Sequence, residues 1–171
     1  VFLHSFAYPA HEAAAGAVLR DAGIAHVALS HEIAREVRAV PRGETACADA
    51  YLTPSLRRAL GDLVAGVADD VPVRFMQSHG GLSDVARASG PRAVLSGPAG
   101  GVTATAALAR MIGAASAVGV DMGGTSFDIG LIDRGEPRVA PESQFEGFPV
   151  KIPILDVHAI GAGGGSLARV D

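Results

Sequence analysis

The sequence VGVDMGGTSFDIGLI, residues 118–132, is the most informative segment of the chain. Its apolar first part is typical of a short strand, and it ends at Asp121. Gly123 and Gly124 then allow the chain to reverse, because glycine adopts turn conformations without a steric penalty. The alternation over residues 126–132 predicts a second strand, with one apolar face made of Phe127, Ile129 and Leu131. We therefore expect a β-hairpin with a carboxylate at its entrance.

This hairpin carries groups that are suited to binding phosphate. Backbone N–H groups at the glycines can surround phosphate oxygens, and Thr125 and Ser126 add hydroxyl donors. Asp121 can hold a hydrated cation. Alternation along the strand points Asp128 either toward a ligand-binding cleft beside the hairpin or at a backbone turn. The pattern is not a Walker loop, because no Gly-Lys-Ser/Thr follows it. A Gly-Gly pair alone is typical of a plain tight hairpin, and only its combination with the acids and hydroxyls favours a phosphate site.

Composition limits the classes of partner that the chain can bind. Its 171 residues are 49% hydrophobic and only 5% aromatic, which favours close helix–sheet packing over large aromatic clusters. The net charge of −4 comes from interspersed acids and bases. We therefore expect no nucleic-acid partner and no anionic membrane partner. No apolar run approaches the ~18 residues that a membrane helix needs, and no leader pattern is present.

The single cysteine, Cys47, excludes an internal disulfide and fits a reducing, cytoplasmic compartment. It lies in a helical pattern with no His or Lys beside it, so a buried structural thiol is the expected role. The chain opens on Val1 rather than Met, and we expect it to be a segment of a longer polypeptide.

The remaining patterns predict an order of helices and strands. Strands at 1–5 and 25–30 around a helix at 11–22 suggest a parallel pair with a crossover helix, and Gly23 ends that helix. After a break at 41–43 we expect a long helix at 45–67 that Pro54 bends or splits. The later expected elements are strands at 72–77, 91–95 and 150–158, a helix at 98–112, a turn at 133–136 and an extended segment at 137–141.

Eight short motifs in order resemble the hydantoinase A/5-oxoprolinase family, which includes the beta-type subunits of acetone and aryl-ketone carboxylases. The two most specific are SGPAGG at 96–101, which opens a helix, and DMGGTSFD at 121–128. The others that resemble this family are FLHS at 2–5, SHEI at 30–33, YLTP at 51–54, MQSHGG at 76–81, LDVH at 155–158 and IGAGGGS at 160–166.

The resemblance implies an α/β fold of the actin, sugar-kinase and chaperone-ATPase type, which is ribonuclease H-like. In that fold two similar domains flank an ATP cleft and a helix joins them. By this similarity, residues 1–97 would end the first domain, 98–113 would form the connecting helix, and 114–171 would begin the second domain.

The resemblance also implies roles for individual residues. The hairpin would grip the β- and γ-phosphates of ATP through the N–H groups of Gly123, Gly124 and Thr125 and through the Ser126 hydroxyl. Asp121 would orient a Mg²⁺ hydration shell or the attacking oxygen, and Asp128 is the second catalytic candidate. The substrate-pocket candidates are His158, Gly163 and Gly164, for which a core histidine and a flexible turn are the alternatives.

Three functions follow as alternatives from the resemblance. The first is ATP-dependent hydrolysis of a cyclic amide, such as 5-oxoproline or a hydantoin, by phosphorylation of the carbonyl oxygen and attack of water. The second is a subunit of an ATP-dependent ketone carboxylase. The third, from a different class, is a non-catalytic nucleotide-binding module that acts by domain closure. We expect a small cyclic amide or ketone as substrate, a hydantoinase B-type domain or subunit as partner, and little or no turnover from residues 1–171 alone.

Overall fold

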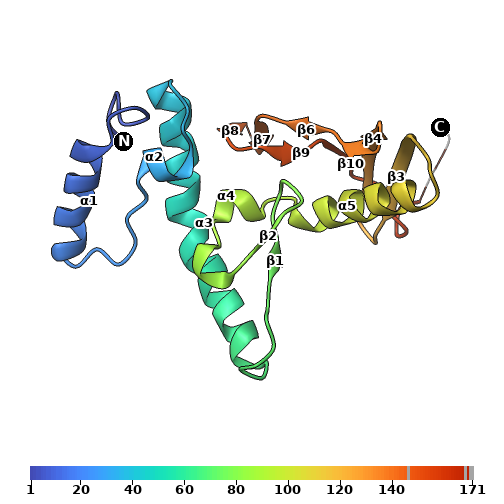
Figure 1. The fold of residues 1–171 in the computed structure, drawn as a ribbon, viewed down its shortest axis with the longest axis horizontal. Helices are drawn as coiled ribbons and strands as arrows, with labels where there is room; N and C mark the ends of the chain where they lie inside the picture. Colours follow the sequence, from blue (N-terminus) through green and yellow to red (C-terminus); the bar gives the residue numbers. More distant parts are fainter. Residues whose placement is uncertain (146, 168, 170–171) are drawn as a thin grey trace. The chain divides into compact units, whose positions relative to one another are not determined.

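The computed structural model describes residues 1–145, 147–167 and 169, and it separates into two compact units. Unit 1 comprises Val1–Phe75, Leu82–Val94 and Pro141–Ile152, and unit 2 comprises Met76–Gly81, Leu95–Ala140 and the described part of Pro153–Asp171. Each unit combines helices with short strands (Figure 1), which agrees with the predicted α/β class. The division into ATPase-like domains at 97/98 and 113/114 stays a prediction.

Unit 1 is built on three helices in its first half. These are α1 (Ala10–Asp21), α2 (Ser30–Ile33) and α3 (Ala39–Ala65). The predicted helix at 11–22 is confirmed as α1, and Gly23, which has φ +91°, follows its end as expected. Its buried face includes Gly16, where a Cβ would lie 2.7 Å from a methyl carbon of Leu29. The smaller elements of unit 1 are β2 (Leu82–Ser83), η1 (Val85–Arg87), α4 (Gly90–Ala93), β7 (Ser143–Phe145) and β8 (Phe148–Val150).

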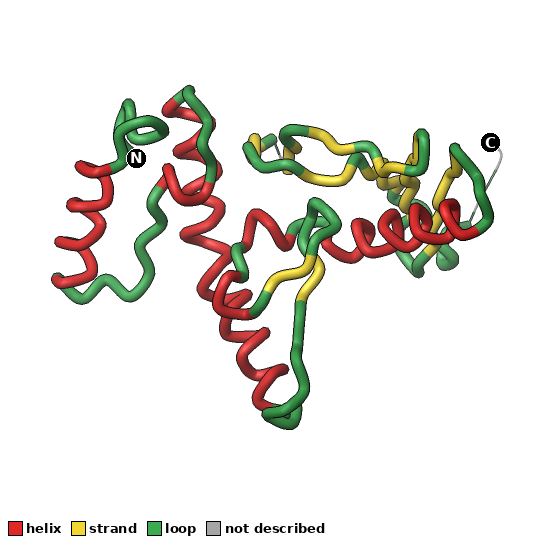
Figure 2. The backbone as a smooth tube through the Cα atoms, in the orientation of Figure 1, coloured by secondary structure: helices red, strands yellow, loops and turns green. Residues whose placement is uncertain are grey.

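The predicted strands at 1–5 and 25–30 are wrong, and with them the parallel pair. Both segments run as turns and loops, as Figure 2 shows, and α2 begins at Ser30. The reason lies in the hydrogen bonds of their backbone. The Arg42 guanidinium donates hydrogen bonds to the carbonyl oxygens of Phe2 and Leu3. The Glu12 carboxylate accepts a hydrogen bond from the Ser30 N–H at 2.8 Å. Because side chains occupy these groups, no neighbouring strand is needed to satisfy them.

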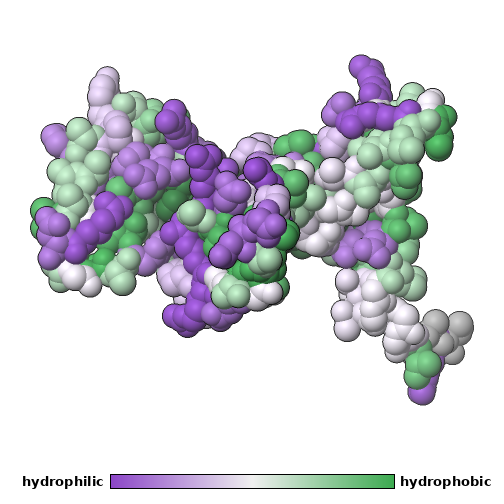
Figure 3. All heavy atoms as spheres, turned by 60° about the horizontal axis from the view of Figure 1, so that its bottom comes forward, coloured by the Kyte–Doolittle hydropathy of each residue, from purple (hydrophilic) through white to green (hydrophobic). Residues whose placement is uncertain are grey.

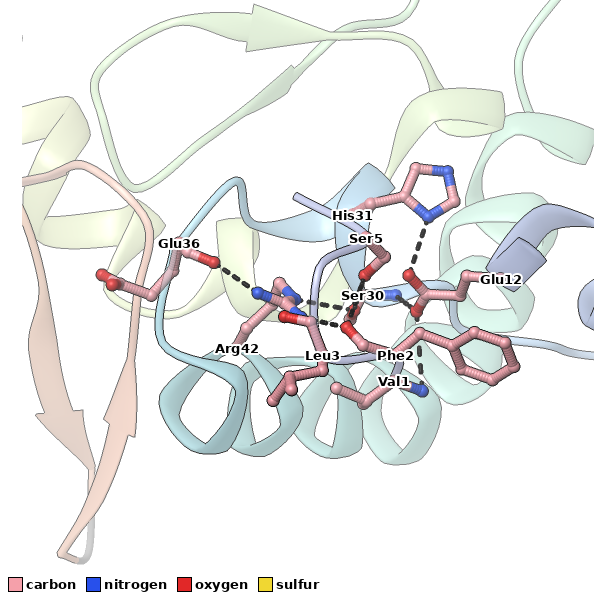
Figure 4. A network of polar contacts seen from close by, with 9 residues as sticks. All are labelled: Val1, Phe2, Leu3, Ser5, Glu12, Ser30, His31, Glu36 and Arg42. Atoms are coloured by element: carbon pink, nitrogen blue, oxygen red, sulfur yellow. Dashed lines mark hydrogen bonds and ion pairs between the residues drawn. The ribbon is translucent and has the colours of Figure 1, made fainter. Parts of the chain in front are cut away.

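Two charged side chains organise this part of unit 1 from inside (Figure 4). Arg42 is fully buried and Glu12 is 2% exposed. The Arg42 Nε donates to Ser30 Oγ at 2.9 Å, and the other guanidinium nitrogens donate to the carbonyls of Phe2, Leu3, Glu36 and Val37. Glu12 Oε2 lies 3.0 Å from His31 Nδ1. The buried charges are thus satisfied by backbone and side-chain partners, which offsets their desolvation.

Helix α3 is longer than predicted and continuous. It runs through Pro41 and Gly43, where a break was expected, and through Pro54, which does not split it. Pro41 is tolerated because the N–H groups of a first helical turn have no helical partner anyway. Cys47 on this helix is exposed, so the predicted buried thiol is wrong.

The predicted strand at 91–95 is also wrong, because residues Gly90–Ala93 form the single helical turn α4. The Gly90 N–H donates to Thr53 Oγ1 at 2.8 Å, and Pro91 occupies an early helical position that its fixed φ favours. A Cβ on Gly90 would lie 2.2 Å from Leu52 Cβ, so only glycine permits α4 to touch α3 here. The strand predicted at 72–77 shortens to β1 (Phe75–Met76), which pairs with β2.

Unit 2 is a helix packed on a small antiparallel sheet. The helix α5 (Ser96–Met111) confirms the helix predicted at 98–112. The sheet has the order β10-β4-β3, with β5 also paired to β4; a separate pair is formed by β6 and β9. The strands are β3 (Ser116–Met122), β4 (Phe127–Asp133), β5 (Glu136–Pro137), β6 (Val139–Ala140), β9 (Ile154–Leu155) and β10 (Val157–Ile160).

The predicted hairpin is confirmed as β3 and β4, and the predicted turn at 133–136 joins β4 to β5. Arg134 and Gly135 both have positive φ, which is the backbone of a tight two-residue turn. The single strand predicted at 150–158 is wrong: β8 ends at Val150, and β9 and β10 are separate strands. Pro153 has no N–H to donate to a ladder, which interrupts pairing in this region.

The core of unit 2 depends on two glycines that face each other across the hairpin. Gly119 and Gly130 are register partners in β3 and β4. A Cβ on Gly119 would lie 2.4 Å from Thr105 Oγ1, and one on Gly130 would lie 2.2 Å from Val102 Cγ2. The missing side chains therefore let α5 lie directly on the hairpin. The buried core around this contact consists of Ala99, Val102, Ala106, Ala109, Ile132 and Leu155.

Many apolar side chains remain at the surface, interspersed with polar ones on the face that Figure 3 draws. On β3, Val118, Val120 and Met122 face away from α5 and are more than half exposed. In the part of the chain that the structure describes, no helix is both long enough and apolar enough to cross a membrane.

Gly130→Ala should destabilise the protein by about 1–3 kcal/mol, because the added methyl group overlaps Val102, whose branched side chain is stiff on a helix. Thermal or denaturant unfolding measures the loss. Gly101→Ala is the matched control, since it lies in α5 with no atom near the position of its Cβ. Combining Gly130→Ala with Val102→Ala should recover part of the loss; a simple sum of the two effects would contradict the close contact.

Acid should weaken unit 1 through Glu12. Burial raises the pKa of this carboxyl, but hydrogen bonds from Ser5, Ser30 and His31 outweigh burial and lower its pKa from 4.5 to about 2. A folded-state pKa below the ordinary value means that the ionised form stabilises the fold. This contribution is complete above about pH 4.5 and is lost as the pH falls toward 2.

Glu12→Gln should therefore lower the free energy of unfolding at neutral pH by about 1–3 kcal/mol, because the hydrogen bonds that the buried carboxylate makes with Ser30 and His31 are weakened. The variant should also lose much of the dependence of stability on pH below 4.5. Glu32→Gln, on the exposed side of α2, is the control and should keep the wild-type profile. Parallel acid-unfolding curves for wild type and Glu12→Gln would refute the assignment.

Candidate functional site

The hairpin brings the two predicted catalytic acids together. Asp121 on β3 and Asp128 on β4 are register partners. They lie two residues from the Gly119/Gly130 pair on each strand, and alternation therefore puts them on the same face of the sheet, toward α5. Sequence spacing alone left the direction of Asp128 open, and the register decides it.

A hollow of about 210 Å³ opens between α5 and the hairpin, and both acids line it. Its other lining residues come from the first half of α5, from β3 and β4, and from β10; they include Pro98, Gly101, Thr105 and Val157. Gly101 of α5 borders open space here, since no atom lies within 4 Å of where its Cβ would be. Its mixed apolar and acidic lining suits the edge of a polar ligand or a hydrated cation.

The turn at the tip of the hairpin presents backbone donors to solvent. The Gly123 N–H donates to Ser126 O at 2.9 Å and closes the turn. Within the described residues, the N–H groups of Gly124 and Thr125 donate to no protein acceptor, and both residues are exposed. Successive free N–H groups in a glycine turn form a concave site for an anion.

The acids carry few bonds of their own. Ser126 Oγ lies 3.4 Å from Asp128 Oδ2, and no hydrogen bond or ion pair from a described residue reaches the Asp121 carboxylate. Among the described residues, no group of three His, Cys, Asp or Glu side chains could hold a metal ion by itself. Two facing carboxylates fit Mg²⁺ nonetheless, because this ion is commonly held by one or two carboxylates, waters and phosphate oxygens.

The predicted substrate residues separate into two groups. Gly163 and Gly164 lie against the turn: the Gly164 N–H donates to Gly123 O at 2.9 Å. His158 is the register partner of Ile129, so its side chain lies on the sheet face opposite to Asp128. His158 is exposed there and does not line the hollow.

Sequence reasoning missed part of this arrangement. Gly119 and Gly130 were not singled out, although their equal distances from the turn at 123–126 indicate cross-strand partners. Thr105 and Pro98 also line the hollow. The small residues Gly100, Gly101 and Ala104 in this helix are the sequence signal that indicates a close contact.

Most of the chain matches a known protein family. The family model described as hydantoinase/oxoprolinase matches residues 42–171. The chain belongs to this family. The resemblance seen in the sequence motifs is thereby confirmed.

Relatives in this family are much longer than the chain. The 5-oxoprolinase 1 of Arabidopsis thaliana is 44% identical over 170 residues, which cover 97% of this chain and 13% of that protein. The crystal structure of ATP-dependent caprolactamase from Pseudomonas jessenii has a TM-score of 0.83 at 35% identity and covers 98% of this chain and 25% of its own. A nucleotide-free acetone carboxylase structure has a TM-score of 0.75 at 25% identity, with the same coverage.

Proposed function

We propose that residues 1–171 are part of an ATP-dependent enzyme that opens a cyclic amide, and that the β3–β4 hairpin binds the phosphates of ATP. The observation that carries the proposal is the exposed turn with the free N–H groups of Gly124 and Thr125, beside the facing acids Asp121 and Asp128. Family membership supports the same reaction class, since relatives include 5-oxoprolinases and an ATP-dependent caprolactamase.

The electrostatics of the hairpin support phosphoryl transfer. The turn would contact the β- and γ-phosphate oxygens through the N–H groups of Gly124 and Thr125, with the Ser126 hydroxyl as a further donor. The Gly123 N–H, which was also expected to contact phosphate, is already donated to Ser126 O. Phosphoryl transfer depends on positioning and charge neutralisation more than on a protein nucleophile. A glycine turn with fixed donors supplies both without a basic side chain.

A cyclic amide gains reactivity from this transfer. Amide resonance makes its carbon a poor electrophile. Transfer of the γ-phosphoryl group to the amide oxygen releases ADP and gives an O-phosphorylated imidate. Water adds to the carbon, the ring C–N bond breaks as the nitrogen takes a proton, and a second water hydrolyses the remaining acyl phosphate. The products are the amino acid, ADP and phosphate.

Asp121 and Asp128 would help to hold the cation that neutralises the phosphate charge in this step. Mg²⁺ would offset the negative charge of the phosphate oxygens when bound, and Asp121 and Asp128 would hold its water ligands at the entrance to the hollow. Asp121 has no protein partner among the described residues, so its carboxylate is available for this role or for orienting the attacking oxygen.

The choice of substrate rests on the relatives. The chain is 44% identical to a 5-oxoprolinase and only 25% identical to an acetone carboxylase. The higher identity favours a lactam substrate over a ketone. A role for His158 in the substrate pocket stays a prediction, as do a hydantoinase B-type partner and a cytoplasmic location. A non-catalytic nucleotide module remains the alternative from another class.

A substrate panel separates these functions. The full-length protein is incubated with ATP, Mg²⁺ and, in turn, 5-oxoproline, a hydantoin, caprolactam, or acetone with bicarbonate, and phosphate release is measured. We expect stimulation by at least one cyclic amide with ring-opened product in equal amount to ADP. Stimulation by acetone alone would favour the carboxylase, and no stimulation by any compound would overturn the enzymatic proposal.

Asp121→Ala in the full-length protein should cost about 2–3 kcal/mol of transition-state stabilisation, because the carboxylate no longer organises the cation. The expected fall in the rate of ATP hydrolysis is on the order of 30- to 150-fold. Asp62→Ala, an exposed aspartate of α3, is the control for loss of a negative charge. An unchanged rate in Asp121→Ala would remove this residue from the mechanism.

A further inference from the structure

The glycine-rich loop that follows β10 is held against the turn of the hairpin. The Gly164 N–H donates to Gly123 O at 2.9 Å, and the Gly165 N–H donates to Gly124 O at 3.2 Å. The loop is closed on itself at Ser166, whose Oγ accepts the Gly163 N–H at 3.0 Å and whose own N–H donates to Gly163 O at 2.9 Å. The loop therefore has a defined backbone conformation where it contacts the turn.

These two contacts control the direction of the free donors. The carbonyl of Gly123 and the N–H of Gly124 belong to one peptide plane, and the carbonyl of Gly124 and the N–H of Thr125 belong to the next. No peptide bond among the described residues is cis, so in each plane the N–H points opposite to the C=O. Because the loop donates hydrogen bonds to the carbonyls of Gly123 and Gly124, the N–H groups of Gly124 and Thr125 point away from the loop and toward solvent.

Gly163 is the residue that permits this approach. It is buried, whereas the rest of the loop from Gly161 to Ser166 is exposed. A Cβ at Gly163 would lie 2.7 Å from Gly123 O, from Gly124 C and from Thr125 N. These are backbone atoms of the same two peptide planes, and they cannot rotate away as a side chain can. A side chain at 163 must lift the loop or tilt the planes.

We propose that the loop Gly161–Ser166 is a positioning element for the anion-binding turn, and that Gly163 sets the orientation of the N–H groups that meet the phosphates of a nucleoside triphosphate. This inference rests on the proposed function of the hairpin. It assigns Gly163 and Gly164 a structural task at the phosphate end of the site rather than contact with the cyclic amide.

The test compares two glycine substitutions within this loop in the full-length protein. Gly163→Ala adds a methyl group that collides with the turn, and Gly161→Ala adds the same group where no atom lies within 4 Å. Binding of a non-hydrolysable ATP analogue is measured by calorimetry, together with KM for ATP, KM for the cyclic amide and Tm. Gly163→Ala should weaken analogue binding and raise the KM for ATP by about tenfold or more, since hydrogen bonds to charged oxygens are misdirected. Gly161→Ala should stay within about twofold of wild type.

The KM for the cyclic amide separates positioning from general damage. A merely structural role would lower Tm and disturb both substrates, whereas the proposal expects the change in the KM for ATP alone. Ser166→Ala provides a milder variant should Gly163→Ala fail to fold: it removes the Oγ that closes the loop and should weaken analogue binding with a Tm close to wild type.

Two further results would overturn the inference, and they differ in meaning. Equal analogue binding by wild type, Gly163→Ala and Ser166→Ala would show that the loop does not position the turn, while the proposed function stands. No analogue binding by wild type would remove the proposed function and this inference with it.

Discussion

The arrangement of unit 2 depends on how closely a helix can lie on a hairpin. Gly119 and Gly130 face each other across β3 and β4, and neither leaves room for a Cβ beneath Thr105 and Val102. The helix α5 therefore contacts strand backbone directly at these two positions. Two residues further along each strand, the first side chains on this face are Asp121 and Asp128. The packing constraint thus fixes both the register of the hairpin and the place where its acids emerge.

Unit 1 solves a different problem with buried charge. Its first thirty residues form only one helix of any length, and their backbone groups need partners that no sheet supplies. Arg42 and Glu12 provide them, through the carbonyls of Phe2 and Leu3 and through the Ser30 N–H. Neither charge is costly in this setting, because each is bonded to several partners. The result is a well-defined chain path that owes little to local secondary-structure preference.

The functional groups of the hairpin are mostly backbone atoms, and this explains how glycine can be informative about chemistry. A phosphate site built from N–H groups needs their direction more than it needs any side chain. The free N–H groups of Gly124 and Thr125 gain their direction from peptide planes whose carbonyls are bonded to the loop after β10. The side chains at the same place, Asp121 and Ser126, add charge and a hydroxyl to a geometry that the backbone has already set.

The hairpin, the helix α5 and the family could be read from residues 96–128, because glycines, acids and apolar alternation at short spacing determine local structure directly. The same local rules wrongly predicted strands at 1–5 and 25–30, because the apolar residues of both segments suit a strand. Their outcome depends on Arg42 and Glu12, whose side chains bond backbone groups that a strand would use for pairing. Long-range contacts also decided the direction of the Asp128 side chain and the position of the glycine loop. Cross-strand register turned Asp128 toward the hollow, and contact across about forty residues turned Gly163 from a flexible link into a fitted one. Short-range spacing therefore specified which groups are present, and long-range hydrogen bonding and steric fit specified where they point.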